Sequence, residues 1–138
     1  MSAPSLLYLD TSAVLRATLE SGLTPLVQER IEAASHLLTS RLSLVEAARA
    51  FHRVRLARKV PEEALGRAIR EVERIWTRCE IWEITATVCE RASQLRPETS
   101  LRTLDALHLA TYLLARERID GLDLLTTDQR LKRAAEGT

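Results

Sequence analysis

Short segments of strand length alternate along this chain with longer segments of helical periodicity, and this alternation constrains the fold more than any other feature. The strand-like segments are Leu6–Leu9, His36–Thr39, Glu80–Ile84 and Asp123–Thr126. Between them, apolar residues recur at the three- and four-residue spacing of one helix face. Such alternation is typical of α/β domains with a mainly parallel sheet. We therefore predict a three-layer α/β/α fold around a mainly parallel central sheet of four strands, with a fifth left open.

Helices are expected between and after these strands. Leu101–Arg118 is apolar on most of its sides, which is typical of a mostly buried helix, and a break is expected just before it at Pro97–Ser100. With 138 residues, 46% of them hydrophobic, the chain is expected to form one domain over residues 1–138. The other expected helices are Ser12–Leu19, Leu26–Ser35, Leu44–Arg58, Thr87–Leu95, Asp128–Glu136 and one with Pro61 as its first residue and Leu65, Ile69, Val72 and Trp76 facing inward.

The composition excludes several classes of protein. Twenty basic and 19 acidic side chains give a net charge of +1, so affinity for nucleic acid would need a local cluster of charge. Cys79 and Cys89 lack the spacing of zinc ligands; their spacing leaves a disulfide open, but we expect two buried thiols in a reducing cytosol. The sequence contains no visible signal peptide or transmembrane segment, which predicts a cytoplasmic protein without membrane contact.

Two aspartates stand where expected strands end. Asp10 follows Leu6–Leu9, and Asp128 comes shortly after Asp123–Thr126. Because ligands of open α/β sheets bind at the carboxyl ends of the strands, both side chains are expected at one rim of the sheet. Taken singly, each could simply cap the helix that follows, since aspartate is a favoured N-cap residue.

Two further acids lie in expected helices. Asp105 sits in an almost wholly apolar stretch, where an isolated charge is costly unless it is paired or bound to a metal. The alternative is that Thr103 caps the helix and leaves Asp105 in its favourable first turn. For Glu46 the alternative is an ion pair with Arg49 or Arg53, three and seven residues further on, of which the first is within helical reach. His108, one turn beyond Asp105, is interpreted as a core histidine.

As a set, the four acids predict a metal site. Carboxylates that converge on one crevice repel one another and raise one another's pKa values. A hard divalent cation removes that penalty, and ligands that are all oxygen select magnesium or manganese. Such a site activates water and neutralises charge that develops on a phosphoryl group.

Four segments of the chain carry a resemblance to a known family: Leu9–Ala13, Ser40–Glu46, Leu104–Ala110 and Leu125–Asp128. They look like the four blocks of a PIN domain, in the right order and at fitting separations, and together they cover nearly the whole chain. Each block alone is a weak signal, whereas the ordered set is fairly specific. In particular, the chain resembles the VapC toxins of prokaryotic toxin–antitoxin pairs.

The resemblance implies both a site and an activity. It implies that the reaction is endonucleolytic cleavage of RNA by water that Mg²⁺ or Mn²⁺ activates, that the protein forms a homodimer, and that a cognate antitoxin silences it. The residues that match the family's metal site are Asp10, Glu46, Asp105 and Asp128, with Asp10 and Asp105 as principal ligands. Those that match the polar positions beside it are Thr11, Ser12 and Thr126.

The chain departs from the family pattern in two places. The run between Asp105 and Asp128 is a few residues longer than expected and includes a second acid, Asp123, which we expect outside the ligand set. The sequence also stops nine residues after Gln129, where many relatives continue into a fifth strand, so that strand is either absent or cut away here.

Basic residues gather beside one of the four acids. The segment 41–59 carries six basic side chains and the single acid Glu46. A basic flank next to an acidic pocket suits binding to a phosphate backbone, and Arg49 and Arg53, on the Glu46 side, are the expected RNA-binding residues. The alternative is a solvated helix face.

Three rival functions compete with this interpretation of the residues. An aspartate-dependent phosphatase of the haloacid-dehalogenase type would have a second acid two residues after Asp10, where this chain has Ser12. A dinucleotide-binding domain lacks its glycine-rich turn after the first strand. A non-catalytic PIN-like interaction module remains as the alternative from another class, although the presence of all four acids argues against it.

Overall fold

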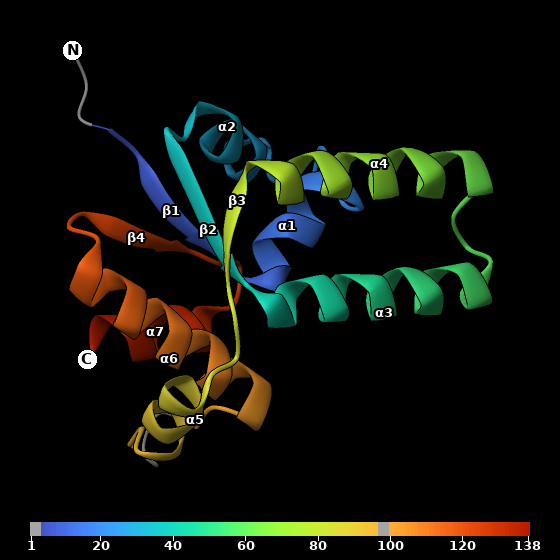
Figure 1. The fold of residues 1–138 in the computed structure, drawn as a ribbon. Helices are drawn as coiled ribbons and strands as arrows, with labels where there is room; N and C mark the ends of the chain where they lie inside the picture. Colours follow the sequence, from blue (N-terminus) through green and yellow to red (C-terminus); the bar gives the residue numbers. More distant parts are fainter. Residues whose placement is uncertain (1–3, 97–99) are drawn as a thin grey trace.

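A computed structural model describes residues 4–96 and 100–138 of the chain (Figure 1). The expected break at Pro97–Ser100 lies almost wholly outside the described residues, which resume at Ser100. The helices and strands are β1 Leu6–Leu9, α1 Thr11–Thr18, α2 Pro25–Ala33, β2 His36–Ser40, α3 Arg41–Ala57, α4 Glu62–Arg78, β3 Cys79–Trp82, α5 Ala86–Ser93, α6 Thr103–Arg118, β4 Leu122–Leu125 and α7 Gln129–Glu136.

The strands form one all-parallel sheet in the order β3-β2-β1-β4. The central strand β1 pairs with β2 on one side and β4 on the other, so that Leu9 lies opposite both Thr39 and Leu125. The carboxyl ends of these three strands therefore lie together at one rim. The predicted three-layer α/β fold with four strands is confirmed, and the described residues contain no fifth strand.

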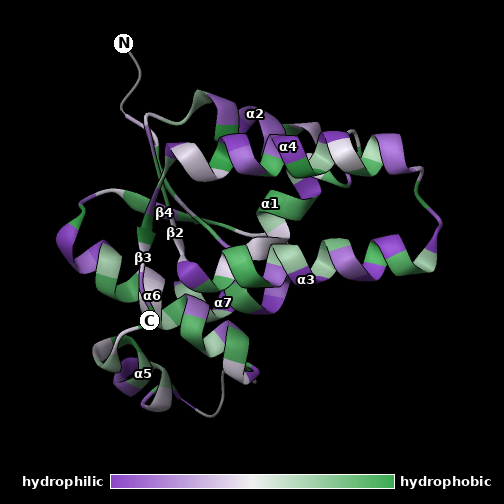
Figure 2. Ribbon diagram, turned by 45° about the vertical axis from the view of Figure 1, so that its right-hand side comes forward, coloured by the Kyte–Doolittle hydropathy of each residue, from purple (hydrophilic) through white to green (hydrophobic). Residues whose placement is uncertain are grey.

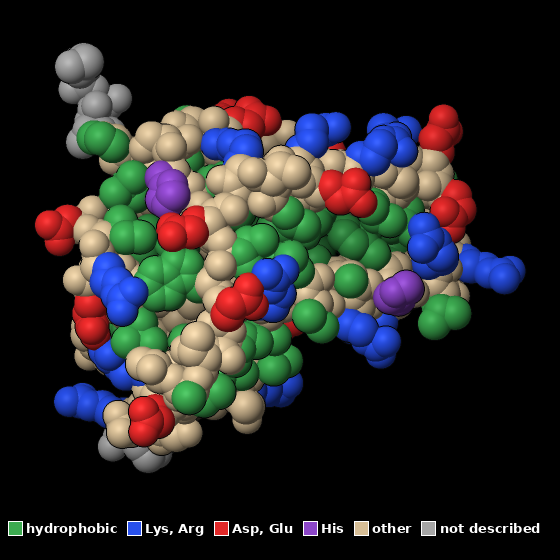
Figure 3. Space-filling view, in the orientation of Figure 1, with side chains coloured by type: hydrophobic (Ala, Val, Ile, Leu, Met, Phe, Trp, Pro, Cys, Tyr) green, Lys and Arg blue, Asp and Glu red, His purple; other side chains and the backbone are tan. Residues whose placement is uncertain are grey.

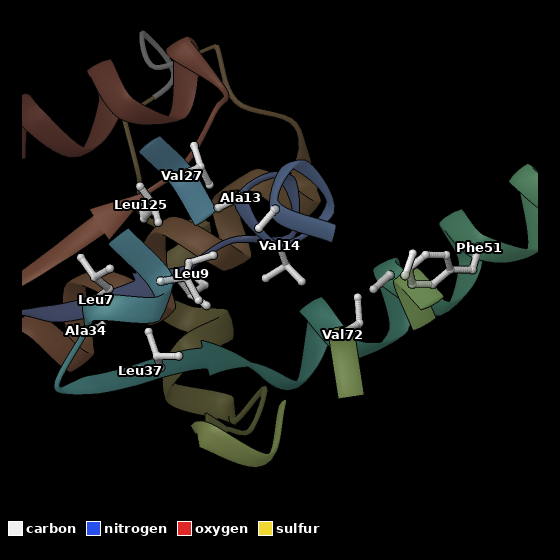
Figure 4. Close-up of a cluster of buried hydrophobic side chains, with 14 of the residues drawn as sticks. Leu7, Leu9, Ala13, Val14, Val27, Ala34, Leu37, Phe51, Val72 and Leu125 are labelled. Carbon is white, nitrogen blue, oxygen red and sulfur yellow. The ribbon is translucent and has the colours of Figure 1, made fainter. Parts of the chain in front are cut away.

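One face of the sheet is covered by α1, α2, α3 and α4. Successive residues of a strand point to opposite faces, and Leu7 and Leu9 of β1 point to this one. They pack with Leu37 of β2 against the small and branched side chains of α1, as Figure 4 shows. Burial of this cluster holds α1 against the face of the sheet, next to the carboxyl end of β1.

The opposite face is covered by α6 and α7. Tyr8 of β1 and Leu38 of β2 point to this side and pack against Leu109 and Leu113 of α6. From residue 108 to residue 113 every side chain of α6 is buried, in agreement with the predicted buried helix. Leu104, in the first turn, is an exception with 48% exposure, because that end of the helix lies at the rim of the sheet.

α3 and α4 extend together beyond the sheet as a pair of helices (Figure 1). Hydrophilic and hydrophobic residues are interspersed along both helices (Figure 2). Their hydrophobic side chains gather in the band between them (Figure 3). Leu65 and Val72 of α4 are buried there with Phe51 of α3, as the predicted inward positions of α4 require.

Several boundaries differ from those expected, and local hydrogen bonding explains the largest difference. α3 begins at Arg41 instead of Leu44, because the Ser40 hydroxyl accepts a hydrogen bond from the backbone N–H of Leu42 at 3.0 Å and caps the helix earlier. Glu46 therefore lies in the second turn of α3. Pro61 occupies the N-cap position of α4 and not its first helical position.

The expectation of two buried thiols is wrong. Cys89 is exposed on α5, where it faces solvent, and Cys79 is half-buried at the start of β3. Both thiols are free. Within the described part of the chain, no helix is long and apolar enough to cross a membrane.

We expect the α3–α4 pair to depend on Leu65, whose side chain is fully buried between these helices and α1. Leu65→Ala should lower the free energy of unfolding by about 2–5 kcal/mol, because it removes packed atoms and leaves a cavity. Leu56→Ala, on the same pair of helices but 83% exposed, should change it by less than about 0.5 kcal/mol. Urea denaturation of both variants checks this, and equal effects would contradict the packing described here.

Candidate active site

A pocket of about 250 Å³ opens at the carboxyl end of β1. Its lining contains four acidic side chains that are far apart in sequence and come from four different parts of the fold. Asp10 directly follows β1, Glu46 lies on α3, Asp105 lies in the first turn of α6, and Asp128 directly precedes α7. The other lining residues are Thr11, Ser12, Leu15, Ala50, Arg53 and His108.

Asp10 is the most deeply buried of these acids, with 4% exposure. The Ser12 hydroxyl lies 2.7 Å from Oδ1 and 3.0 Å from Oδ2 of Asp10, and the Thr126 hydroxyl donates to Oδ2 at 2.7 Å. Both hydroxyls are held in turn by the segment after β4, since Ser12 accepts from the Thr127 N–H and Thr126 accepts from the Asp128 N–H, each at 3.0 Å. The pairing of β1 with β4 thus brings together the two hydroxyls, of Ser12 and Thr126, that hold the Asp10 carboxylate.

Asp10 and Asp128 also cap helices, as the alternative interpretation of each held. Oδ1 of Asp10 accepts from the Ala13 N–H at 3.1 Å, at the start of α1. Oδ1 of Asp128 accepts from the N–H groups of Arg130 and Leu131 at 2.9 Å and 3.4 Å, at the start of α7. Each cap fixes one carboxylate oxygen, and both carboxylates still line the pocket. Capping and pocket lining are therefore compatible.

Glu46 is held by a second set of contacts. The Thr11 hydroxyl donates to Oε1 of Glu46 at 2.6 Å, and Nε2 of His108 lies 2.6 Å from the same oxygen. Nδ1 of His108 lies 2.9 Å from the Tyr8 hydroxyl. Neighbouring residues of the chain thus serve different acids, because Thr11 contacts Glu46 and Ser12 contacts Asp10.

Burial and hydrogen bonding shift the pKa values of these two acids in opposite directions. Burial raises the pKa of Asp10 above its ordinary value, and the hydrogen bonds from Thr126 and Ser12 offset this only in part. Burial also acts to raise the pKa of Glu46, but hydrogen bonds from His108 and Thr11 outweigh it, so the pKa of Glu46 is lowered. Glu46 is therefore a stable carboxylate, whereas the charge on Asp10 is penalised.

Asp105 is half-buried and its pKa is raised. Desolvation is the largest cause, followed by repulsion from the Asp128 carboxylate. The residue lies in the first turn of α6, as the alternative interpretation held, but Thr103 does not cap this helix, which begins at Thr103 with Arg102 as an N-cap that makes no side-chain bond. The first-turn position alone does not stabilise the charge enough to keep its pKa low.

The donors of this pocket suit a hard divalent cation. They are carboxylate and hydroxyl oxygens together with one imidazole, and the described lining contains no cysteine. A cation would also relieve the penalty on the charges of Asp10 and Asp105. Among the described residues, no three His, Cys, Asp or Glu side chains stand close enough together to hold an ion as they are. The four carboxylates therefore line one pocket but do not converge on a single point within it.

The structure separates the two arginines that the sequence proposed for RNA binding. Arg53 lies on the same face of α3 as Glu46 and Ala50 and lines the pocket with them. Arg49 is exposed on α3 and is not part of the lining. The alternative ion pair of Glu46 with Arg49 or Arg53 does not form, because Glu46 contacts His108 and Thr11 instead. Asp123 lies outside the lining, as expected, in an exposed ion pair with Arg30 at 3.0 Å.

His108 is the pocket residue that the sequence reasoning missed. It is buried as a core histidine would be, with 3% exposure, but it also contacts Glu46. The available signal was its spacing from Asp105, because residues three apart share a helix face. What the spacing did not reveal was that the contact is made with an acid on another helix.

Known proteins resemble this chain in sequence and in fold. The family model described as PIN domain matches residues 7–137. Ribonuclease VapC35 of Mycobacterium tuberculosis is 36% identical over 135 residues, which span 95% of this chain and 90% of that protein.

Solved structures share the fold at lower identity. PAE2754 from Pyrobaculum aerophilum has a TM-score of 0.66 at 20% identity, over 97% of this chain and 82% of that one. A toxin–antitoxin complex from Klebsiella pneumoniae has a TM-score of 0.61 at 24% identity, over 90% of this chain and 87% of that one.

The raised pKa of Asp10 leads to a prediction about stability and pH. A carboxyl group whose pKa is higher in the folded state favours folding most at pH values below its unfolded pKa, and this contribution is lost as the pH rises through the folded pKa. In chelator-treated protein, Asp10→Asn should therefore gain stability relative to the wild type as the pH rises from 4 to 8, since asparagine also caps helices well. Denaturant titrations across this range measure the difference.

The control for this experiment is Asp120→Asn, which changes an exposed carboxylate beyond the end of α6. It changes the same functional group outside the pocket and so provides the reference curve. If the stability difference of Asp10→Asn changes with pH no more than this reference does, the buried charge carries no penalty.

Proposed function

The chain belongs to the PIN domain family, and from this premise we propose that it is a metal-dependent endoribonuclease, the toxin of a toxin–antitoxin pair. One observation carries the proposal: four acids from four parts of the fold line a single polar pocket at the carboxyl ends of the strands. A relative that is 36% identical over nearly the whole chain is named a ribonuclease, which supports the same activity here.

In this proposal the four acids would hold Mg²⁺ or Mn²⁺, with Asp10 and Asp105 as principal ligands. The ion, when bound, activates water and neutralises charge that develops on the phosphoryl group. The protein's own contribution is to hold the oxygens in place before substrate arrives. Ser12 and Thr126 orient the Asp10 carboxylate, and Thr11 orients Glu46.

We propose that the RNA backbone approaches the pocket along α3. Arg53 is the basic side chain in the pocket lining, beside the acids, and suits a phosphate next to the one that is cleaved. Aromatic residues make up only 4% of the chain, which disfavours a platform for base stacking. Selection of RNA would then rest on its shape, its phosphates and a few polar contacts.

We further propose a cognate antitoxin and a homodimeric assembly. A solved structure of similar fold is itself a toxin–antitoxin complex, which supports the first of these. The acidic pocket suits a basic side chain of such an antitoxin, which would compete there with the cation. Growth arrest on expression of the chain, relieved by the neighbouring upstream open reading frame, tests this partner, and persistent arrest in its presence would contradict it.

Asp105→Asn should abolish the activity while leaving the fold intact. The substitution removes a charge that desolvation, and then repulsion from Asp128, already penalise, so the thermal midpoint should not fall. Cleavage of RNA with Mn²⁺ should decrease by about 100-fold or more, equivalent to about 2.7 kcal/mol of transition-state stabilisation. Calorimetric titration of Mn²⁺ should show the matching loss of affinity.

The control is Asp123→Asn, which removes an exposed acid outside the pocket and should keep full activity. Full cleavage by Asp105→Asn would contradict the proposed site. Equal, weak Mn²⁺ binding by the wild type and Asp10→Asn would favour a non-catalytic module. Hydrolysis of a chromogenic phosphate ester would favour a phosphatase.

Arg53→Ala should weaken RNA binding more than Arg49→Ala does. Both residues are exposed cations on α3, but only Arg53 lines the pocket. In the Asp105→Asn background, Arg53→Ala should reduce affinity roughly tenfold and lower the slope of log affinity against log salt by about 0.7, the value for one lost contact to single-stranded RNA. Fluorescence anisotropy at several salt concentrations measures both, and identical curves for the two variants would remove Arg53 from the substrate path.

A further inference from the structure

A buried histidine joins the core to the wall of the pocket. His108 is 3% exposed, and both of its ring nitrogens are engaged. Nδ1 meets the Tyr8 hydroxyl of β1 at 2.9 Å, and Nε2 meets Oε1 of Glu46 on α3 at 2.6 Å. The ring therefore links a central strand, a buried helix and the helix on the other side of the sheet.

The partners determine which nitrogen carries the hydrogen. A carboxylate oxygen can only accept, so Nε2 must donate to Glu46. In the neutral ring Nδ1 then accepts, and the Tyr8 hydroxyl donates to it. Tyr8 is fully buried, and its burial, followed by the charge of Asp10, raises its pKa well above the usual range, so the hydroxyl keeps its hydrogen.

Glu46 needs such a partner because its side chain is long and rotatable. Ordering a glutamate costs side-chain entropy, which a hydrogen bond from an immobile group offsets. His108 and Thr11 both contact Oε1, and neither of these contacts uses Oε2. One oxygen is thus held at the pocket wall, which leaves the other to act in the pocket.

We infer that His108 is a positioning residue that, oriented by Tyr8, holds the Glu46 carboxylate where the pocket needs it. The inference rests on the proposed function for its consequence, because it assigns to His108 the placement of one of the four acids of the nuclease site. It distinguishes His108 from an ordinary core histidine, whose loss would affect stability and leave cation binding unchanged. Partners that orient metal ligands typically contribute 10–100-fold in metal affinity.

The first experiment is a double-mutant cycle on Mn²⁺ affinity, measured by calorimetry without RNA. His108→Leu fills the space but donates no hydrogen bond, and it should weaken Mn²⁺ binding about 10–100-fold. Because His108 acts through Glu46, the same change in the Glu46→Gln background should add little. His108→Gln restores a donor and should recover part of the affinity.

Two buried tyrosines provide a matched pair of variants. Tyr8→Phe removes the hydroxyl that orients His108, whereas Tyr112→Phe removes a hydroxyl that donates to the backbone carbonyl of Leu122 at 3.2 Å, on the side away from the pocket. Tyr8→Phe should weaken Mn²⁺ binding and lower kcat for RNA cleavage with little change in KM. Tyr112→Phe should leave both unchanged, although each variant loses one buried hydrogen bond.

A second experiment needs neither metal nor RNA. In metal-free protein, long-range ¹H–¹⁵N correlation spectra should show His108 protonated at Nε2. Glu46→Gln should permit a mixture of the two tautomers, because an amide can donate as well as accept, and Tyr112→Phe should not. A ring protonated at Nδ1 alone in the wild type would overturn the inference.

The outcomes separate this inference from the proposed function. If the wild type neither binds Mn²⁺ nor cleaves RNA, the proposed function fails, and the tautomer alone decides the place of His108. If the wild type does both and the His108 and Tyr8 variants match Tyr112→Phe, the inference fails and the function stands. If His108→Leu does not fold, Tyr8→Phe decides, and unchanged Mn²⁺ affinity in that variant overturns the inference.

Discussion

The parallel pairing of β1 with β4 positions Asp10, the most deeply buried acid of the pocket, and the other acids lie around it. This register places Leu9 opposite Leu125, so the first residue beyond β1 and the first beyond β4 lie side by side. Asp10 and Thr126 are those residues, and their side chains meet at 2.7 Å. A register shift of one residue would turn every side chain of the strand to the other face and separate them. The hydrophobic pattern of β1, with Tyr8 facing one layer and its neighbours the other, specifies the register.

Acidic side chains at this rim lose hydration when they are buried, and the hydrogen bonds of the fold compensate for that loss only in part. Asp10 receives hydrogen bonds from two hydroxyls and a backbone N–H, yet its pKa is still raised because its carboxylate is almost fully removed from water. The pKa of Asp105 is raised as well, because of desolvation first and repulsion from Asp128 second. Glu46 differs because an imidazole and a hydroxyl donate to it. The charges left uncompensated at this rim are those that a cation would neutralise.

The polar side chains around the pocket form two separate sets. Ser12 and Thr126 hold Asp10, and both are fixed by backbone N–H groups that follow β4. Thr11 and His108 hold Glu46, and His108 is fixed by Tyr8 from the interior of the sheet. The first set therefore depends on the pairing of β1 with β4, and the second set depends on the packing of α6 and α3 against β1. Each acid is positioned by the elements nearest to it.

The sequence by itself determined the order of helices and strands, the parallel sheet and the placement of Asp10 and Asp128 at strand ends, because these follow from local periodicity and from the rule that ligands bind at the carboxyl ends of strands. It also singled out Asp105, since a charge in an apolar helix has few inexpensive environments. Only the tertiary structure decided the partners of Glu46, the separation of Arg53 from Arg49, and the contact of His108 with the pocket. Those features depend on the rotation of α3 and α6 about their axes and on the distance between them, which long-range packing sets and local sequence patterns do not encode. The early start of α3 at Arg41 belongs with them, because Ser40 acts as the cap only once β2 has ended there.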